Sequence, residues 1–525
     1  METRWQDVKK KSSMVVGRIL EHHAGFNPEG EALVFGARRL SWRELDGGAN
    51  RLGHLLQSLG ATHGDRVVLL LHNSVEFVES YFGIAKIGCI SAPVLPTLVG
   101  SEVAFIANKL RARFMIVDAS AADLYRSIAG ELTSVEHVIG VGDGHGLPID
   151  YAARTAACPS DAPEADVEPT DDLTIKFTSG TTGRPKGCVR THQAFIMGLL
   201  NALTEHPLHQ DDVGLVAQPL AAGMAVYFLL LYLYQGMRVV MLPKFDPELY
   251  LEAVEQERIT HATAMDWMAR RLGAHPDFVK RDLSSLRILH GINQLRSLDS
   301  WHRQPTFRAD ITAGYASSEA GGLVTFKTPS DFRRAFAEPD FPGAHSCGRP
   351  GRLCQVECVD EHMNPVPVGE VGEIAVSGPA LFRGYWELPE ETAKALHNGW
   401  LLTGDLAYQD ERGYVFLCGR KRDMIRSGGI NVYPAEIEPV LLAHPAVREA
   451  AVIGVPDSHW GERVVACIVP EFACTEEEIL AYCRERLGAH KRPKSVRFFD
   501  ALPTNGTGKI VKKDLVAMVQ SVEAA

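Results

Sequence analysis

Apolar and polar positions follow two different periods through the first third of the chain. Ser41 and Glu44 have the spacing of a capping box, and the helix that they open has its apolar residues on one face. Short apolar runs at 67–71, 90–94 and 114–117 are typical of buried strands, and helical patterns separate them. Strands that alternate with helices at this spacing predict parallel βαβ units, and therefore an α/β fold.

The C-terminal part of the chain has a different pattern. After the polar segment 419–423, helical and strand-like stretches follow one another, and Thr475 forms a second capping box with Glu478. This pattern predicts a compact α+β domain. We therefore expect an N-terminal domain over 1–421 and a C-terminal domain over 422–525.

Length, charge and cysteine content restrict the class of protein. A chain of 525 residues exceeds what one core normally supports, so at least two domains are expected. The net charge is −11 and the only lysine block is 9–11, which argues against nucleic acid as a partner. The longest apolar run, 224–234, is shorter than the ~20 residues that span a bilayer. With no apolar signal segment at the start and ten scattered cysteines that we interpret as reduced, the sequence predicts a cytoplasmic protein.

One loop has the composition of a polyphosphate site. Residues 178–187 read TSGTTGRPKG and follow the apolar and β-branched run 173–177. Glycines let backbone N–H groups approach phosphate oxygens, hydroxyls donate further hydrogen bonds, and Lys186 supplies a mobile positive charge. A Walker A motif needs a glycine before the lysine and Ser or Thr after it, and both are lacking here. The loop follows a predicted strand, which is where ligands of parallel sheets bind.

Four further motifs follow in order. They are YASSE at 315–319, TGD at 403–405, GRKRD at 419–423 and NGTGK at 505–509. With these motifs the chain resembles the acyl- and aryl-CoA synthetases of the adenylate-forming superfamily over nearly its whole length, and its C-terminal part resembles 4-chlorobenzoate–CoA ligase. The resemblance implies an α/β fold: a large N-terminal domain of α/β subdomains with a β-barrel portion, and a small, mobile α+β C-terminal domain.

The resemblance also assigns a nucleotide site. It implies that the ring of Tyr315 faces adenine, that Asp405 accepts hydrogen bonds from the ribose hydroxyls, and that Arg420 contacts the nucleotide. The residues implied for ATP and AMP are Thr178, Ser179, Gly180, Thr181, Thr182, Gly183, Lys186, Gly291, Ile292, Asn293, Tyr315, Ser318, Asp405, Arg420 and Lys509.

Three residues are implied to be catalytic, and one to act as a hinge. Glu319 matches the family's magnesium-binding carboxylate, and a carboxylate suits this role since a hard cation prefers oxygen ligands. Ser318 stands where the family has a phosphate-contacting Thr and keeps the hydroxyl. Lys509 matches the adenylation lysine, whose long stem carries a point charge to the reacting groups. Arg422 matches the hinge, where relatives have Lys or Asp, and a long solvated side chain still permits rotation there.

Coenzyme A and the acid are assigned in the same way. The implied CoA contacts are Gly428, Gly429, Trp460, Arg492 and Lys494, since an indole can stack on adenine and two cations suit the 3′-phosphate. The implied acyl pocket consists of Ala221, Ala222, Gly223, Gly314 and Ala316. Small residues replace the aromatic or His gate that follows Pro-Leu in relatives, so we expect a roomy apolar pocket. The apolar string that follows also fits a buried helix.

The resemblance implies an ATP- and Mg²⁺-dependent ligase. It would convert a hydrophobic carboxylic acid, whether fatty, aromatic or alicyclic, to its acyl-CoA through an acyl-AMP, with AMP and pyrophosphate as products. The expected partners are the acid, ATP and CoA, with no nucleic acid, and a homodimer is compatible with the family. Two alternatives stay open: an enzyme that loads a carrier-protein phosphopantetheine, and a luciferase-like oxygenase. The sequence does not name the acid.

Overall fold

The computed structural model describes residues 13–178, 185–293, 295–338, 340–504 and 510–524. The chain divides into two compact units, one formed by 1–356 with 376–401 and the other by 357–375 with 402–525. The division passes through three strands of one sheet, β19 (Gln355–Val359), β20 (Gly372–Ser377) and β23 (Trp400–Gln409). The predicted boundary at 421/422 lies inside the second unit and stays a prediction.

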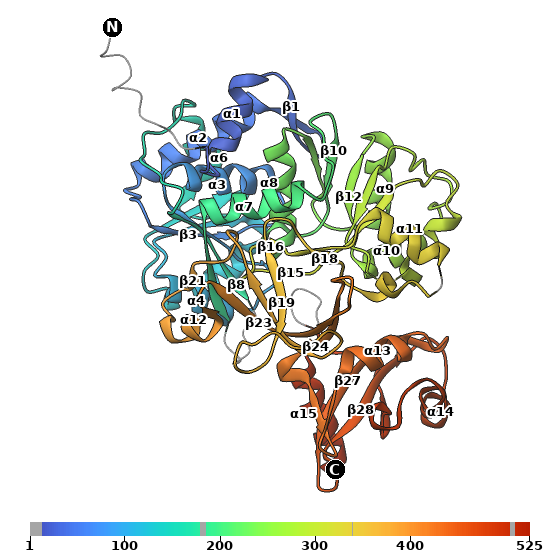
Figure 1. The fold of residues 1–525 in the computed structure, drawn as a ribbon. Coiled ribbons are helices and arrows are strands. Elements are labelled where there is room, and N and C mark those ends of the chain that lie inside the picture. Colours follow the sequence, from blue (N-terminus) through green and yellow to red (C-terminus); the bar gives the residue numbers. More distant parts are fainter. Residues whose placement is uncertain (1–12, 179–184, 294, 339, 505–509, 525) are drawn as a thin grey trace. The chain divides into compact units, whose positions relative to one another are not determined.

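Two large sheets form the first unit (Figure 1). The eight-stranded sheet has the order β21-β9-β8-β4-β3-β5-β6-β7, with parallel pairing from β8 to β7 and antiparallel pairing of β9 with β8 and β21. Its strands are β3 (Arg66–Leu70), β4 (Ile90–Pro93), β5 (Phe114–Asp118), β6 (His137–Val141), β7 (Ile149–Asp150), β8 (Asp172–Thr178), β9 (Lys186–Thr191) and β21 (Gly384–Tyr385).

The seven-stranded sheet has the order β14-β13-β12-β10-β11-β1-β2 and is parallel except for the pair β1–β2. Its strands are β1 (Glu31–Phe35), β2 (Arg38–Ser41), β10 (Val213–Val216), β11 (Arg238–Met241), β12 (His261–Thr263), β13 (Ile288–His290) and β14 (Asp310–Thr312). Two short hairpins follow it, formed by β15 (Ala316–Ser317) with β16 (Gly322–Leu323) and β17 (Thr325–Phe326) with β18 (Arg349–Pro350).

The helices of this unit cover the sheets on both faces (Figure 1). They are α1 (Arg18–Phe26), α2 (Trp42–Ser58), α3 (Val75–Lys86), α4 (Gly100–Leu110), α5 (Ala122–Ile128), α6 (Tyr151–Ala156), α7 (His192–Leu203), α8 (Met224–Gln235), α9 (Pro247–Gln256), α10 (Asp266–Gly273), α11 (Pro329–Ala337) and α12 (Pro389–Ala395). The helices and strands predicted between 41 and 117 are all confirmed.

Successive side chains along each strand point to opposite faces of its sheet, and this alternation produces a layered core. In β3, Val67 and Leu69 point to a core shared with α2, α3, α7 and α8, whereas Val68 and Leu70 point to a core with α4 and α5. In β1 of the other sheet, Leu33 joins the same shared core and Val34 joins a third core with α9 and α10. The helices of the shared core therefore lie between the two sheets.

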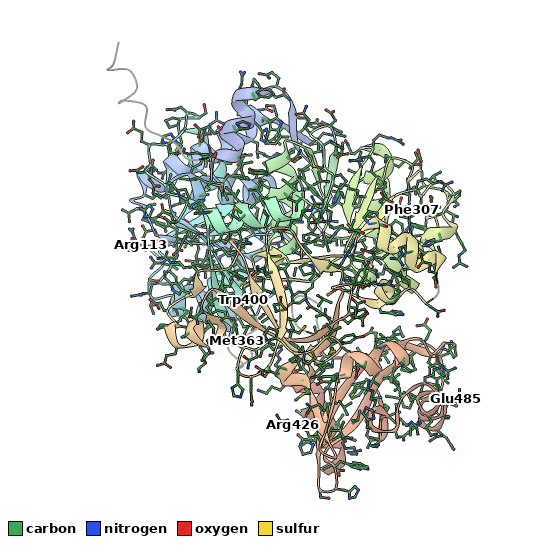
Figure 2. All side chains as sticks on the ribbon, viewed as in Figure 1. Arg113, Phe307, Met363, Trp400, Arg426 and Glu485 are labelled. Carbon is green, nitrogen blue, oxygen red and sulfur yellow. The ribbon has the colours of Figure 1, made fainter. Side chains whose placement is uncertain are left out.

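Polar side chains align the amino ends of the parallel strands. Arg113, labelled in Figure 2, precedes β5 and pairs with Asp65 before β3 at 2.7 Å and with Glu136 before β6 at 2.8 Å. The carboxyl ends of these strands lie at the opposite edge of the sheet. Parallel sheets bind ligands at that edge.

A buried carboxyl group lies where α2 packs on α3. Glu79 of α3 is 9% exposed, accepts a hydrogen bond from the Tyr151 hydroxyl at 2.8 Å, and lies against Gly48 of α2. Burial raises the pKa of Glu79 to about 7, because the charged form loses its hydration. This carboxyl group is therefore an ionisable part of the core.

The Pro- and acid-rich segment 158–172 is irregular through 171 but attached to α2. Side chains of that helix donate hydrogen bonds to its carbonyl groups: Asn50 to Ser160 at 2.8 Å and Gln57 to Glu164 at 2.9 Å. Backbone groups of the segment are thus paired although it has no regular structure.

The second unit contains the C-terminal α+β structure. Its sheet has the order β26-β25-β28-β27, with β29 beside β28, and helices cover both faces. The elements are β25 (Ile425–Ser427), β26 (Ile430–Val432), α13 (Pro434–Leu442), β27 (Val447–Asp457), β28 (Gly461–Pro470), α14 (Glu476–Arg486), β29 (Ser495–Phe498) and α15 (Lys512–Ala524). The capping box at Thr475 is confirmed at the start of α14.

The resemblance implies a β-barrel portion, and the β-rich part of the structure is a five-stranded sheet. It consists of β19, β20 and β23 with β22 (Leu396–His397) and β24 (Val415–Arg420). The expectation that all of 419–423 forms a polar link is wrong in part, because Gly419 and Arg420 pair with β23 and continue β24. Only 421–423 form a short 3₁₀ turn.

The ten cysteines are all free thiols, and seven of them are buried. The apolar run at 224–234 forms α8, whose side chains from Ala225 to Leu233 are buried. Within the part of the chain that the structure describes, no helix has the length and apolarity needed to cross a membrane.

Candidate functional site

The glycine-rich loop connects two antiparallel strands. Thr178 ends β8 and lies directly opposite Lys186, which begins β9. Because β8 runs parallel to β4, the loop emerges at the carboxyl end of the parallel strands, as predicted. The predicted contacts Ser179, Gly180, Thr181, Thr182 and Gly183 lie outside the described residues.

Lys186 is held by two neighbours at the base of this loop. Its Nζ lies 2.5 Å from Glu391 Oε2 on α12 and 5.0 Å from the ring centroid of Tyr385. Hydrogen bonds from Lys186 and then Lys394 lower the pKa of Glu391 to about 2. The lysine is therefore pre-positioned by a carboxylate and an aromatic face.

Glu319 lies in the turn between β15 and β16, and two contacts fix it. The Tyr385 hydroxyl donates a hydrogen bond to Glu319 Oε1 at 3.1 Å, and the Phe382 backbone N–H donates to the Glu319 carbonyl at 2.9 Å. Burial, followed by the charge of Glu319, raises the pKa of Tyr385.

Tyr385 thus contacts two predicted site residues, Lys186 with its ring and Glu319 with its hydroxyl. The sequence reasoning did not find it. Tyr385 lies 66 positions from Glu319, and no motif among those that carry the resemblance includes it. Tyr385 stands out as an aromatic residue on a strand that pairs with β9, but this is apparent only once the pairing is known.

The residues around Glu319 are closely packed. Tyr315 is 8% exposed, and its backbone N–H donates to Thr325 Oγ1 at 3.0 Å. A β-carbon at Gly314 would lie 2.1 Å from the Thr325 carbonyl oxygen, so only glycine fits there. Ala316 and Ser318 are partly exposed on the same turn.

Gly291, Ile292 and Asn293 follow the carboxyl end of β13. Gly291 has φ +107°, and its N–H donates to the Thr312 carbonyl at 2.9 Å. Ile292 is buried, whereas Asn293 is exposed. The segment therefore anchors one end in the core and presents its other end to solvent.

The predicted acyl-pocket residues form a turn before α8. Leu220–Ala222 is a 3₁₀ turn, and Gly223 follows it with φ +93°. Ala222 and Ala316 are partly buried and pack against the same core between the two sheets. The structure thus brings the two predicted parts of the acyl wall to one core, and it also confirms the buried helix that the apolar string allowed.

In the second unit, Asp405 and Arg420 lie opposite each other on β23 and β24. Arg420 Nε is 2.6 Å from Asp405 Oδ1, and the Asp405 side chain is 10% exposed. Glu373 supports the next positions, accepting from the Gly404 N–H at 2.9 Å and from Lys421 Nζ at 2.8 Å.

Three of the predicted CoA residues lie together. Lys494 Nζ is 4.7 Å from the centroid of the Trp460 ring. The Gly428 N–H donates to the Trp460 carbonyl at 2.8 Å, and a β-carbon there would lie 3.1 Å from Trp460 Cε3. Gly429 follows with φ +79°, and Arg492 Nε donates to the Leu487 carbonyl at 2.9 Å.

The remaining predicted residues are the hinge and the adenylation lysine. Arg422 is in the turn 421–423, and its side chain is 45% exposed. Lys509 lies outside the described residues.

Comparisons with known proteins agree with this architecture. Residues 20–386 match the family described as AMP-binding enzyme, and residues 436–509 match the AMP-binding enzyme C-terminal domain. Among solved structures, the anthranilate CoA ligase AuaEII in complex with anthranoyl-AMP is 28% identical with a TM-score of 0.89, covering 97% of this chain and 98% of that one.

Curated relatives also match over nearly the whole length of both chains. A feruloyl-CoA synthase from Amycolatopsis sp. is 35% identical, covering 94% of this chain and 96% of the relative. The long-chain-fatty-acid–CoA ligase FadD13 from Mycobacterium tuberculosis is 32% identical, covering 95% and 97%.

The fold is that of an adenylate-forming enzyme, with a large N-terminal and a small C-terminal domain. The chain belongs to the AMP-binding enzyme family. The family resemblance drawn from the motifs is thereby confirmed, and the finer likeness to 4-chlorobenzoate–CoA ligase stays a prediction.

Proposed function

We propose that this chain is an AMP-forming acid–thiol ligase that converts a hydrophobic carboxylic acid to its acyl-CoA. The observation that carries the proposal is the end-to-end correspondence with acyl- and aryl-CoA ligases, which leaves no domain of those relatives unmatched. The AMP-binding enzyme model and the model of its C-terminal domain both match this chain.

In the first half-reaction, a carboxylate oxygen of the acid attacks the α-phosphorus of ATP. The acyl-AMP forms, and the bond to the β-phosphate breaks to release pyrophosphate. Lys186 and the hydroxyls of 178–183 hold the β- and γ-phosphates, and Lys509 stabilises the charge that develops between carboxylate and phosphate. Asp405 binds the ribose, and Arg420 beside it contacts the nucleotide.

Glu319 is the residue that would hold Mg²⁺. Its carboxylate is partly exposed and fixed on one side by Tyr385, so oxygen acceptor sites stay available to a hard cation. Bound Mg²⁺ supplies neutralisation of phosphate charge. Tyr385 orients the carboxylate, and Ser318 on the same turn donates to the phosphate.

In the second half-reaction, the CoA sulfur attacks the acyl carbon, the thiol loses its proton, and AMP leaves. Trp460 stacks on the adenine of CoA, while Lys494 and Arg492 face its 3′-phosphate. The two glycines at 428 and 429 keep the surface beside the indole free of side chains.

The two steps use two orientations of a C-terminal domain over 422–525, with Arg422 as the hinge. Its exposed side chain and its place in a short turn support this assignment. We also place the enzyme in the cytoplasm, and a homodimer is compatible with the proposal.

The acid is held by Ala221, Ala222, Gly223, Gly314 and Ala316. The small side chains at 221–223 leave space where a gate would otherwise lie, which favours bulky hydrophobic acids.

A screen of pyrophosphate release tests the function. Fatty, aromatic and alicyclic acids are supplied with ATP and Mg²⁺, with and without CoA, in air and under nitrogen. We expect acid-dependent pyrophosphate release without CoA and thioester formation with it. Thioester formation only with a phosphopantetheinylated carrier protein would establish the carrier-loading alternative, and light emission or oxygen consumption without CoA would establish the oxygenase.

A further inference from the structure

One cation beside the predicted acyl wall has no acidic partner among the described residues. Lys176 lies in β8, where the neighbouring Thr174 and Ile175 are buried. Its Nζ donates a hydrogen bond to the Ala221 carbonyl, and no carboxylate of the described chain pairs with it. Burial alone lowers the pKa of Lys176 to about 8.

The position of Lys176 relates it to the substrate. Its Cε is 3.6 Å from the place that a β-carbon on Gly223 would occupy, and it bonds Ala221, so it lies against the turn 221–223. It is also two residues before Thr178, where the phosphate loop begins. Lys176 therefore lies between the predicted acyl wall and the predicted phosphate site.

The hydrogen bond to Ala221 does not explain a lysine at this position. The segment around this turn is already fixed by Asn73, whose Oδ1 accepts from the Leu220 N–H at 2.7 Å and whose Nδ2 donates to the Gln218 carbonyl at 2.9 Å. An ammonium group also has three donors, and the Ala221 carbonyl uses one. Lys176 is partly exposed, so its remaining N–H groups are open to an acceptor on a bound substrate.

We infer that Lys176 is a specificity residue that selects an acid carrying a second oxygen acceptor on its acyl body, in addition to the carboxylate that reacts. The acceptor, a carboxylate or a neutral oxygen, receives the free N–H groups of Lys176 inside a wall that is otherwise apolar. This inference rests on the proposed function and narrows its substrate class.

Matched pairs of acids test it. Each pair has the same chain or ring and ends in methyl or carboxylate, and a third member ends in a methyl ester. Acid-dependent pyrophosphate release gives kcat/KM, and calorimetric titration of the same acids gives binding without turnover. The variants are Lys176→Met, which keeps the length without the charge, and Lys176→Gln, which keeps a neutral donor, with Lys244→Met on an exposed loop as the matched control.

The wild-type enzyme should prefer the oxygen-bearing acid of each pair by about tenfold to a hundredfold, as expected for a hydrogen bond to a charged group. Lys176→Met should abolish this preference while the KM for ATP and the thermal midpoint stay as in the control. Lys176→Gln should keep the preference for the ester, which needs only a hydrogen-bond donor, and lose most of the preference for the carboxylate, which also needs the charge.

Equal or better use of the methyl-ended acids by the wild-type enzyme would overturn the inference, as would a uniform loss for all acids in Lys176→Met. The two proposals fail separately. Acceptor-dependent binding without pyrophosphate release would reject the ligase and keep the role of Lys176, whereas pyrophosphate release with methyl-ended acids alone would keep the ligase and reject that role.

Discussion

Arg420 Nε contacts Asp405 Oδ1 across 2.6 Å, from directly opposite positions on the paired strands β23 and β24. The Asp405 side chain is largely buried and the guanidinium is 43% exposed. The pair therefore presents its cationic side outward and holds the carboxylate in one orientation. A ribose that binds Asp405 would meet an acceptor that needs no rearrangement.

Asp405→Asn should raise the KM for ATP. The amide keeps the shape but loses the charge that receives two ribose hydroxyls and pairs with Arg420, so we expect kcat/KM for ATP to fall by about tenfold to a hundredfold. Steady-state pyrophosphate release measures this. Asp410→Asn, in the turn that joins the same two strands, is the matched control. An unchanged KM for ATP in Asp405→Asn would remove this residue from the nucleotide site.

Lys509→Ala should abolish acyl-AMP formation by at least about a hundredfold, because a positive charge at the developing carboxylate–phosphate bond is lost. Thioester formation from supplied acyl-AMP should be retained, since that step does not need the charge. Single-turnover assays of each half-reaction measure both rates, with the exposed Lys513→Ala of α15 as control. A similar fall in both half-reactions would contradict the assigned role.

Trp460→Ala should raise the KM for CoA by one to two orders of magnitude, as lost base stacking is worth about 1–3 kcal/mol. Pyrophosphate release without CoA should be spared. Phe472→Ala, another exposed aromatic residue of the second unit, provides the comparison. If CoA dependence does not change, the indole is a surface residue and the carrier-protein alternative gains weight.

Ala222→Phe should narrow the acyl site, because a ring replaces a methyl group on the turn before α8. We expect bulky acids to lose about tenfold or more in kcat/KM, short acids to lose little, and the KM for ATP to stay unchanged. A panel of acids of graded size measures the selectivity. Equal loss for all acids in a folded protein would show that Ala222 does not line the acyl site.

Glu79→Gln should change the pH dependence of stability. The folded pKa of about 7 is above the unfolded value of 4.5, so the stability that Glu79 contributes is fully present below 4.5 and is lost as pH rises through 7. The full effect is about 3 kcal/mol. The variant should therefore have a higher thermal midpoint than wild type at pH 8. Its thermal midpoint should also change less than that of wild type between pH 4.5 and 7. Thermal melts across pH test this, with the exposed Glu131→Gln as control; parallel profiles for wild type and Glu79→Gln would refute it.

Much of the fold could be predicted from local pattern. The capping boxes at Ser41 and Thr475 both open helices, because they satisfy backbone N–H groups whatever the tertiary context. The link at 419–423 was predicted less well, since Gly419 and Arg420 become strand only through pairing with β23, which no local signal shows. Long-range pairing decided that element.

The site shows the same limit. Lys186 and Glu319 were found from motifs, but Tyr385, which touches both, was not, because the contact joins positions 66 and 199 residues apart in the chain. Lys176 had a signal in the sequence, a lysine within the run 173–177, yet its position beside Ala221 depends on where η3 (Leu220–Ala222) lies. Sequence motifs can identify individual functional residues, but which of them are in contact is known only from the folded structure.

The free thiols of this chain provide attachment sites for spectroscopic labels. Cys158 in the first unit and Cys474 in the second are partly exposed, and the third such thiol, Cys354, donates hydrogen bonds to the Val324 and Gly351 carbonyls. With Cys354 replaced by serine, a donor dye and an acceptor dye on the other two would span both units. Energy transfer between them would then test whether the separation of the units changes during turnover, with no new cysteine introduced.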